Sequence, residues 1–521
     1  MMDQWLNRID RFNTKNLILW VVAASILLAA WMQYIQHGWI NPDSVLYLEQ
    51  ARLFSLGDWR GATQVFNWPL YGACIGFVHK LTSLSIHVSA QLLNMLFFGM
   101  ATASFLCLIK LAGGNNRTLV AGTLLLFGSQ YIVGDVLEML MRDEGFWAFY
   151  LTALVFFIRY NQQLKKRDAV LWQICTMFAI LFRIEAILFL LFLPLIVLFE
   201  QSKPIAWRLK KTLNAYSLTI LATIIIGATL ATQPQLSMSQ FGRLQEVFTL
   251  NLYHEFTQQL FTKANIMSSQ VLGTYLEEFA IPGLLLTFLY VMGSKIITAT
   301  GFIGTGLAVL NLKQSYIKQP HLKQLLPTMQ PTVRRILIMI CLIAFISMAL
   351  IITKVFVLSS RYVVALAWVL LIFASFYFSA LSSNPLKKPR AVFLIICLIL
   401  GLGFIKNTLP KRDGYNFAQD AVAWVQSANT DNKQVYYDDS RLRYYAKAPF
   451  QGKGDFWKSL EANINNKNTL PYDYLILTIG KRDQAKKDML EQQLSNYKEV
   501  KRFYHTKHKK YCAIYLKQFE L

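Results

Sequence analysis

The stretch His37–Pro69, HGWINPDSVLYLEQARLFSLGDWRGATQVFNWP, follows the first long apolar run, and the interpretation of the whole chain starts from it. Asn41, Pro42 and Asp43 predict a helix start. Asparagine caps helices, proline suits the first helical position and an acidic residue suits the first turn. A carboxylate is therefore expected on a short helix beside a membrane-spanning segment.

The helix that begins there has an amphipathic pattern. Apolar residues between Val45 and Phe54 are expected to lie on a membrane surface, while Glu49 and Arg52 face water. Gly57 is expected to end the helix, because glycine favours the left-handed conformation that follows a helix C-terminus. The pattern predicts a helix lying flat at the mouth of a membrane protein.

The composition is that of a polytopic membrane protein. Of the 521 residues, 55% are hydrophobic and 16% are charged, and the mean hydropathy is +0.36. Soluble domains are about 45–50% apolar and about 25% charged. The net charge of +23 would suit a nucleic-acid partner. Most basic residues, however, lie in short loops between apolar blocks, which the positive-inside rule explains without nucleic acid.

Apolar blocks long enough to cross a bilayer recur through residues 1–405. At about 20 residues a span, they predict about eleven spans, within a range of roughly 10–13. The shorter block Leu70–Leu81 is expected at the interface, and Ile281–Leu312 is expected to hold one span plus irregular backbone, or a re-entrant pair. The predicted spans are Leu17–Ile35, Leu84–Leu111, Leu119–Val133, Phe146–Ile158, Ala169–Phe182, Ala186–Phe199, Leu213–Ala231, Ile281–Leu312, Ile336–Ile352, Val363–Leu381 and Ala391–Ile405.

The charged residues between these blocks predict their orientation. Every predicted inside loop is basic, beginning with Arg8, Arg11 and Lys15, and the outside loops carry nearly all the acidic residues of the membrane half. This bias puts the N-terminus in the cytoplasm. An odd number of spans then puts the C-terminal segment outside. The first apolar run lacks a small-residue cleavage site and is interpreted as an uncleaved span.

Two domains are expected. Residues 1–405 form a transmembrane catalytic domain with outer loops at 36–83 and 233–280, and residues 406–521 form a soluble extracytoplasmic α/β domain. The amphipathic part of the second loop, Arg243–Glu278, is either a lid or lipid-tail site, or a surface cover. The soluble domain is predicted to have helices at Asn416–Ala428 and Lys486–Tyr497, strands at Gln434–Tyr437 and Tyr472–Ile479, and a hairpin of Val500–His505 and Tyr511–Gln518.

Ionisable residues at the predicted outer ends of the spans are the candidate site residues. They are Asp43 in the first loop, Arg142, Asp143 and Glu144 at the fourth span, Arg183 and Glu185 between the fifth and sixth, and Arg361 before the tenth. Each has a structural explanation, such as a helix N-terminus, an i,i+4 pair of Glu138 with Arg142, or interface snorkelling. Together they indicate function, because charges at membrane depth are costly. Carboxylates deprotonate an acceptor, and arginines hold a phosphate.

Five short motifs resemble those of GT-C glycosyltransferases that use polyprenyl-phosphate sugars. The relatives that the chain resembles most are bacterial protein O-mannosyltransferase-like and aminoarabinose (lipid A) transferase-like enzymes. The resemblance covers most of the chain in architecture and some thirty residues in motifs. The motifs are N-P-D-S-x-x-Y-L from Asn41, N-W-P-L-Y (Asn67–Tyr71), R-D-E-G-F-W (Arg142–Trp147), F-R-I-E-A (Phe182–Ala186) and S-S-R-Y (Ser359–Tyr362).

The resemblance implies roles for these residues. Asp43 would be the base that activates the acceptor, and Asp143 would position donor or acceptor, with Glu144 as the neighbouring catalytic candidate. Arg183 and Arg361 would contact the donor phosphate. Supporting roles fall to Glu185, Arg142 and Tyr47. Whether a divalent metal takes part is left open, and Asp43 and Asp143 would be its ligands.

The resemblance implies a multi-pass enzyme of a bacterial inner membrane that moves a sugar from a polyprenyl-phosphate carrier to an extracytoplasmic glycan, lipid or protein. A single inverting displacement is expected, because a phosphate leaving group needs little acid assistance and one base then suffices. The chain lacks the Thr-Lys-Gly turn of aminoarabinose transferases and the W-W-D-Y-G motif of oligosaccharyltransferases. Both absences argue against those enzymes' acceptors.

Two other classes of function stay open. A transporter or flippase of lipid-linked sugars would have inverted repeats and ionisable residues at the midplane, and the sequence has neither. A membrane sensor or assembly protein would work through the C-terminal domain. There, Tyr436–Arg441 and Arg443–Tyr445 are aromatic and polar enough to bind sugar, or they form a strand end and its packing.

Overall fold

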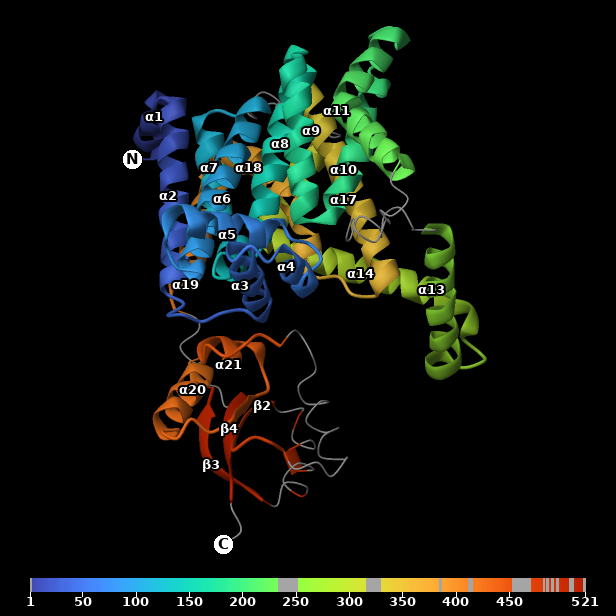
Figure 1. The fold of residues 1–521 in the computed structure, drawn as a ribbon. Helices are drawn as coiled ribbons and strands as arrows, with labels where there is room; N and C mark the ends of the chain where they lie inside the picture. Colours follow the sequence, from blue (N-terminus) through green and yellow to red (C-terminus); the bar gives the residue numbers. More distant parts are fainter. Residues whose placement is uncertain are drawn as a thin grey trace. The chain divides into compact units, whose positions relative to one another are not determined.

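The computed structural model divides the chain into two compact units (Figure 1). The first unit comprises Met1–Trp31, Gln91–Glu138 and Arg142–Thr408. The second comprises Met32–Ala90, Met139–Met141 and Leu409–Leu521, so the first loop belongs with the C-terminal segment. The structure describes residues 2–232, 252–314, 329–383, 387–410, 416–451, 470–480, 483, 487–488, 492, 496–505 and 510–518. Residues 233–251 of the predicted second outer loop lie outside this set.

Helices make up the described part of the first unit, and the predicted polytopic helical class is confirmed. They are α1 (Met2–Arg11), α2 (Thr14–Tyr34), α6 (Ile86–Leu111), α7 (Asn116–Phe127), η1 (Gln130–Val136), α8 (Asp143–Gln163), α9 (Lys166–Phe182), η2 (Ile184–Ala186), α10 (Ile187–Phe192), η3 (Leu193–Phe199), α11 (Ile205–Thr232), α13 (Leu252–Met267), η5 (Ser268–Leu272), η6 (Glu277–Phe279), α14 (Ala280–Thr300), α15 (Phe302–Gln314), α17 (Pro331–Val355), η7 (Ser360–Tyr362), α18 (Val364–Ser383) and α19 (Lys387–Thr408).

Each of the eleven predicted spans coincides with helix. Within the described residues, 7 helices are long and apolar enough to cross a membrane: α2, α6, α11, α14, α17, α18 and α19. An eighth span is counted if α7 and η1, bent by 45°, are taken together. The other predicted spans fall on α8, α9 and the pair α10 and η3. These helices are shorter or more polar, so length and apolarity alone give fewer than eleven spans.

The helix α18 forms the centre of the first unit. It packs against α7, α14, α15, α17 and α19, and 83% of its apolar window is buried. Its largest buried side chains are Trp368, Phe373, Phe376 and Phe378. By contrast, only 11% of the window is buried in α11 and 17% in α19, which is typical of helices that face lipid.

Of the two expectations for Ile281–Leu312, the irregular backbone is wrong, and the re-entrant pair stays a prediction. The segment forms two helices, α14 and α15, that meet at Gly301. Gly301 has φ +82, a left-handed conformation that ends α14. Because glycine adopts this conformation readily, α15 begins directly after Gly301 without a connecting loop.

The first loop folds into three helices in the second unit: α3 (Pro42–Ser55), α4 (Trp59–Val65) and α5 (Leu70–Thr82). The predicted helix start is confirmed, since α3 begins at Pro42 and the Asn41 side chain accepts a hydrogen bond from the Asp43 N–H at 2.8 Å. Gly57 follows the helix with φ +84, also as predicted.

The prediction that α3 lies with its apolar face open to a membrane surface is wrong. Residues Ser44–Leu48 are buried in succession, and so is Gln50. The Gln50 amide donates to the backbone oxygens of Ala62 and Phe66 at 3.0 and 2.7 Å. Protein surrounds α3 on more than one side because α4 and α5 pack against it.

The C-terminal segment contains a four-stranded sheet in the order β1-β2-β4-β3. Strand β1 pairs with β2 in parallel, and the other pairs are antiparallel. Figure 1 shows α20 alongside these strands, and its contacts place it on one face of the sheet. The elements are α20 (Phe417–Ala428), β1 (Val435–Tyr437), α21 (Ser440–Tyr445), β2 (Tyr474–Gly480), β3 (Tyr497–Tyr504) and β4 (Lys510–Lys517).

The sequence predicts most of these elements. The first helix, the two buried strands and the hairpin are confirmed within three residues. Both faces of the central strands are buried, because Ile476 and Ile514 pack on the side of α20 and Leu475 and Leu477 pack on the opposite side. Their apolar runs are therefore continuous, which is why the sequence predicts buried strands. The predicted helix Lys486–Tyr497 lies largely outside the described residues, and its last residue, Tyr497, is in β3 instead.

Candidate active site

A buried cluster of two arginines and two carboxylates joins three distant segments of the first unit. Asp143 is the first residue of α8, and its side chain is 1% exposed. One of its oxygens accepts a hydrogen bond from Arg183 Nη1. Arg361 approaches from a third segment, with Nη2 2.8 Å from Oδ2 and Nε 3.3 Å from Oδ1. Asp143 therefore holds both arginines.

Two carboxylates and two aromatic rings surround the Arg183 guanidinium. Besides Asp143, it pairs with Glu185, with Nη2 3.2 Å from Oε1. Its guanidinium carbon lies 4.8 Å from the ring centroid of Tyr362 and 5.9 Å from that of Phe146. Such contacts satisfy a buried cation. This geometry suits Arg183 to holding its neighbours in place.

Arg361 is the more accessible of the two arginines. Its side chain is 26% exposed, against 4% for Arg183. Both arginines line a cavity of about 10 Å³, room for roughly one water molecule, together with Glu185 and Tyr362. Part of the Arg361 side chain is therefore accessible, whereas Arg183 is enclosed.

Local backbone geometry explains how these side chains meet. The helix α9 ends at Phe182, and Arg183 is extended with φ −146 and ψ 119 before the short turn η2 begins. The Ser359 hydroxyl accepts a hydrogen bond from the Arg361 N–H at 3.4 Å and starts the turn η7. Arg183 therefore lies between α9 and η2, and Arg361 lies in the short turn η7 before α18. Neither arginine is part of a long helix.

Close packing of α8 on α9 requires Gly145. Figure 1 shows the two helices running side by side, in agreement with their contacts. A Cβ atom on Gly145 would lie 2.6 Å from Cδ1 of Phe182. Phe182 is 1% exposed and directly precedes Arg183. The glycine therefore sets how closely the start of α8, with Asp143, approaches the end of α9, with Arg183.

The other predicted residues of the fourth span are also buried. Glu144 is 0% exposed and forms no ion pair within the described part of the chain, so it differs from its neighbour Asp143. Arg142 is 8% exposed and stands at the N-cap position of α8. Neighbouring positions on a helix point about 100° apart. This explains why Asp143 joins the cluster and Glu144 does not.

Asp43 and Tyr47 belong to the second unit. Asp43 is half-buried in the first turn of α3. Tyr47 is 4% exposed and packs edge-on against Tyr71, with ring centroids 5.1 Å apart. The Asn41 side chain contacts the Met139 sulfur at 3.1 Å. Tyr47 is therefore placed as a packing residue of the first loop, and Asp43 keeps partial access to solvent.

The predicted metal ligand Asp143 is surrounded by positive charge. In the ranges that the structure describes, no three His, Cys, Asp or Glu side chains gather to hold one. Both oxygens of Asp143, moreover, accept hydrogen bonds from arginines, and cations crowd any ion there. The arrangement around Asp143 is that of an ion-pair network.

Comparison with known proteins gives likenesses among solved structures. No protein-family model matches the chain, and no curated protein matches its sequence. Among solved structures, the chain is similar to the arabinofuranosyltransferase AftD from Mycobacteria, at 13% sequence identity and a TM-score of 0.45. The match covers 98% of this chain and 40% of AftD. The chain thus spans less than half the length of that enzyme.

The aromatic and polar residues singled out in the C-terminal domain separate into two groups. Tyr436 and Tyr437 are buried in β1, as the packing interpretation predicts. Asp439 caps α21 and pairs with Arg441, with Nη2 2.7 Å from Oδ2. Residues 443–445, by contrast, lie on α21, and Tyr444 reaches a cavity that the sequence does not indicate.

Proposed function

We propose that this protein is an integral-membrane glycosyltransferase that moves a sugar from a polyprenyl-phosphate carrier to an extracytoplasmic acceptor. The observation that supports the proposal most is the buried cluster of Asp143, Arg183, Glu185 and Arg361. Charged groups in a membrane-embedded fold are costly to bury and are retained mainly where function requires them. Their sequence motifs are those that resemble the GT-C enzymes.

In the proposed function, the cluster holds Arg361 in the orientation that binds the phosphate of the donor. A guanidinium presents parallel N–H donors that match phosphate oxygens, and its charge does not titrate in water. Asp143 holds the guanidinium through Nε and Nη2, and 26% of the Arg361 side chain is exposed. We assign donor-phosphate contact to Arg361 and a positioning role to Arg183, the more deeply buried of the two.

The reaction is a single displacement at the anomeric carbon of the donor sugar. The Asp43 carboxylate takes the proton of the acceptor hydroxyl as that oxygen forms a bond to the anomeric carbon. The bond from that carbon to the phosphate oxygen breaks, and the polyprenyl phosphate leaves with the electron pair. Arg361 stabilises the charge that develops on the leaving phosphate. The anomeric centre inverts, and no step needs a metal or a second carboxylate.

A transfer assay in proteoliposomes tests this proposal. The purified protein receives a panel of polyprenyl-phosphate hexoses and pentoses, and release of polyprenyl phosphate is measured for wild type and Asp43→Asn. The asparagine keeps the shape of the side chain but is not a base, so transfer should fall by about 10²-fold or more. Equal transfer by the two proteins would contradict Asp43 as the base.

Asp58→Asn is the matched control. Asp58 lies in the same loop and caps α4, its side chain accepting a hydrogen bond from the Gly61 N–H at 2.8 Å. Asparagine caps as well as aspartate, so this variant should transfer sugar like wild type. If labelled lipid crosses the bilayer in the wild-type vesicles without any release of polyprenyl phosphate, the protein is a transporter and the transferase proposal is wrong.

A further inference from the structure

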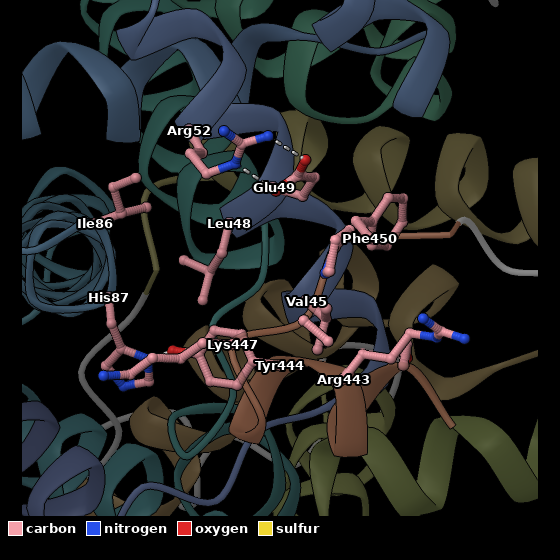
Figure 2. Close-up of a pocket in the computed structure, with 13 residues that line it drawn as sticks. Val45, Leu48, Glu49, Arg52, Ile86, His87, Arg443, Tyr444, Lys447 and Phe450 are labelled. Carbon is pink, nitrogen blue, oxygen red and sulfur yellow. Dashed lines mark hydrogen bonds and ion pairs between the residues drawn. The ribbon is translucent and has the colours of Figure 1, made fainter. Parts of the chain in front are cut away.

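The second unit contains a cavity of about 610 Å³ between the first loop and the C-terminal domain (Figure 2). This volume is in the range of small-molecule sites, about 300–1,000 Å³. Figure 2 shows Arg52 and Glu49 at one end, Tyr444, Lys447 and His87 at the other, and Leu48 between. The remaining lining residues are Val45, Ile86, Ser440, Arg443, Ala448, Pro449 and Phe450.

One face of α3 forms a wall of this cavity. The lining positions Val45, Leu48, Glu49 and Arg52 are spaced at i, i+3, i+4 and i+7, which puts them on one side of a helix. Asp43 stands two residues before Val45, about 3 Å away along the helix axis but on another side. A ligand in the cavity is therefore bound on the helix of the proposed base, at some distance from the reacting group.

Hydrogen bonds hold the opposite wall in place. His87 Nδ1 and the Tyr444 hydroxyl are 2.8 Å apart, which joins the start of α6 to α21. The hydroxyl of the next residue, Tyr445, accepts a hydrogen bond from the Ile40 N–H at 3.1 Å. These two hydrogen bonds connect α21 to the start of α6 and to Ile40, so the walls of the cavity are held in defined positions.

The charges around the cavity favour an anion. Arg52, Arg443 and Lys447 are cationic, and Glu49 is the one carboxylate among the described residues that line the cavity. Glu49 already forms a bidentate pair with Arg52, at 2.8 Å for both contacts. Phe450 and Tyr444 add aromatic surface. Aromatic rings with a few convergent cations suit a ligand that has a weakly polar ring and an anionic group.

Lys447 adopts a backbone conformation that its side chain does not favour. It follows α21 with φ +55, at the position where glycine usually ends a helix. The capping hydrogen bonds are present, from Lys447 N to Tyr444 O at 3.1 Å and from Ala448 N to Arg443 O at 2.9 Å. Glycine would fit this position with less strain. Lys447 therefore lies at the end of α21 in a fixed turn and lines the cavity.

From this cavity we infer a second binding site, which takes a saccharide carrying a phosphate or carboxylate group. The identification of this saccharide as the acceptor rests on the proposed function. The site then holds a part of the acceptor remote from the reacting hydroxyl, and Lys447 contributes to selecting acceptors. Binding far from the reacting atoms supplies specificity without taking part in the chemistry.

Equilibrium binding to the full-length protein in nanodiscs of zwitterionic lipid tests the inference, with no donor present. The probes are glucose 6-phosphate, glucuronate, glucose and inorganic phosphate. The two anionic sugars should bind, and glucose and inorganic phosphate should each bind at least about tenfold more weakly, since a charge-assisted contact is worth about a factor of ten or more. Equal binding of glucose, or of inorganic phosphate, would overturn the inference.

Lys447→Gly separates binding from folding. It removes the charge and relieves the left-handed strain, so affinity for the anionic sugars should fall about tenfold while the melting temperature stays level or rises. Lys447→Arg should bind like wild type, because it keeps the charge. Asn432→Gly is the control, because Asn432 is also left-handed, with φ +52, and does not line the cavity. Unchanged affinity in Lys447→Gly would contradict the inference.

Two further arms keep this inference distinct from the transferase proposal. Arg361→Lys should bind the anionic sugars like wild type even if transfer is lost, because Arg361 belongs to the first unit. If wild type binds the probes but transfers no sugar, the site stands and the transferase proposal fails. If nanodiscs with anionic lipid abolish probe binding, a lipid headgroup occupies the cavity and the saccharide assignment is wrong.

Discussion

Asp143 and Arg361 are 218 positions apart in the sequence, yet two nitrogens of the Arg361 guanidinium bond to the two carboxylate oxygens of Asp143. The carboxylate is 1% exposed, and Arg183 bonds to it as well. The cluster thus fixes three chain segments against one another at the start of α8. Because two cations share one buried anion, removing the anion affects both arginines at once.

The first prediction concerns this shared carboxylate. Asp143→Ala leaves Arg183 and Arg361 without their common partner, and breaking a buried ion pair costs roughly 3–5 kcal/mol. Thermal unfolding in detergent should show a clear loss of stability, and sugar transfer should be abolished. Asp10→Ala is the control, because its pair with Arg117 is more exposed and should contribute only about 0–1 kcal/mol. Similar melting temperatures for the two variants would argue against a structural role of the cluster.

The second prediction separates the charge of Arg361 from its shape. Arg361→Lys keeps the positive charge but cannot form a fork to Asp143 and a phosphate at once. Transfer should fall at least about tenfold, chiefly through a higher KM for the polyprenyl-phosphate donor, whereas the KM for the acceptor should stay level. Steady-state kinetics with each substrate varied in turn measures this. A lysine variant with wild-type donor KM would remove Arg361 from the donor site.

The third prediction tests the contact between α8 and α9. In Gly145→Ala the new Cβ meets the buried ring of Phe182, and overpacking of this kind costs about 1–3 kcal/mol. Displacement of Phe182 should also move Arg183, so both stability and transfer should decrease. The double variant Gly145→Ala/Phe182→Leu makes room for the methyl group and should recover part of both. No recovery would mean that Gly145 acts through the backbone.

The fourth prediction concerns pH and the C-terminal domain. Burial raises the pKa of Asp438 to about 7, although the Thr478 N–H and hydroxyl both hydrogen-bond to its carboxyl group. The unfolded chain releases this proton near pH 4. The folded state therefore holds one more proton between pH 4 and 7, so this contribution to stability is greatest at low pH and is lost as pH rises through 7. It is at most roughly 4 kcal/mol.

Asp438→Asn checks that sign. The amide accepts from the Thr478 N–H and donates to its hydroxyl without titrating. The melting temperature of wild type, relative to this variant, should fall from pH 5 to pH 8. Asp431→Asn, at an exposed position, should leave the wild-type pH profile unchanged. A constant difference between wild type and Asp438→Asn across this range would show that Asp438 is already ionised at pH 5.

Elements with a strong local pattern could be predicted from the sequence. Asn41 and Pro42 start α3 because capping needs only neighbouring atoms, and short continuous apolar runs define β2 and β4. The surroundings of α3 are not local, and there the prediction fails. The apolar pattern of α3 predicts a face on a membrane surface, whereas in the structure α4 and α5 cover these residues. A single helix's pattern shows that a face is apolar and does not show what covers it.

The candidate site divides in the same way. Hydropathy and charge alone determined that the chain is a polytopic helical protein, and they selected Asp143, Arg183, Glu185 and Arg361 as unusual charges at span ends. Only the tertiary structure decided that these four form one cluster, that Glu144 stays outside it, and that Lys447 and His87 line a separate cavity. Periodicity and hydropathy are properties of consecutive residues. Which distant side chains meet is set by how the helices pack, through contacts such as Phe182 on Gly145.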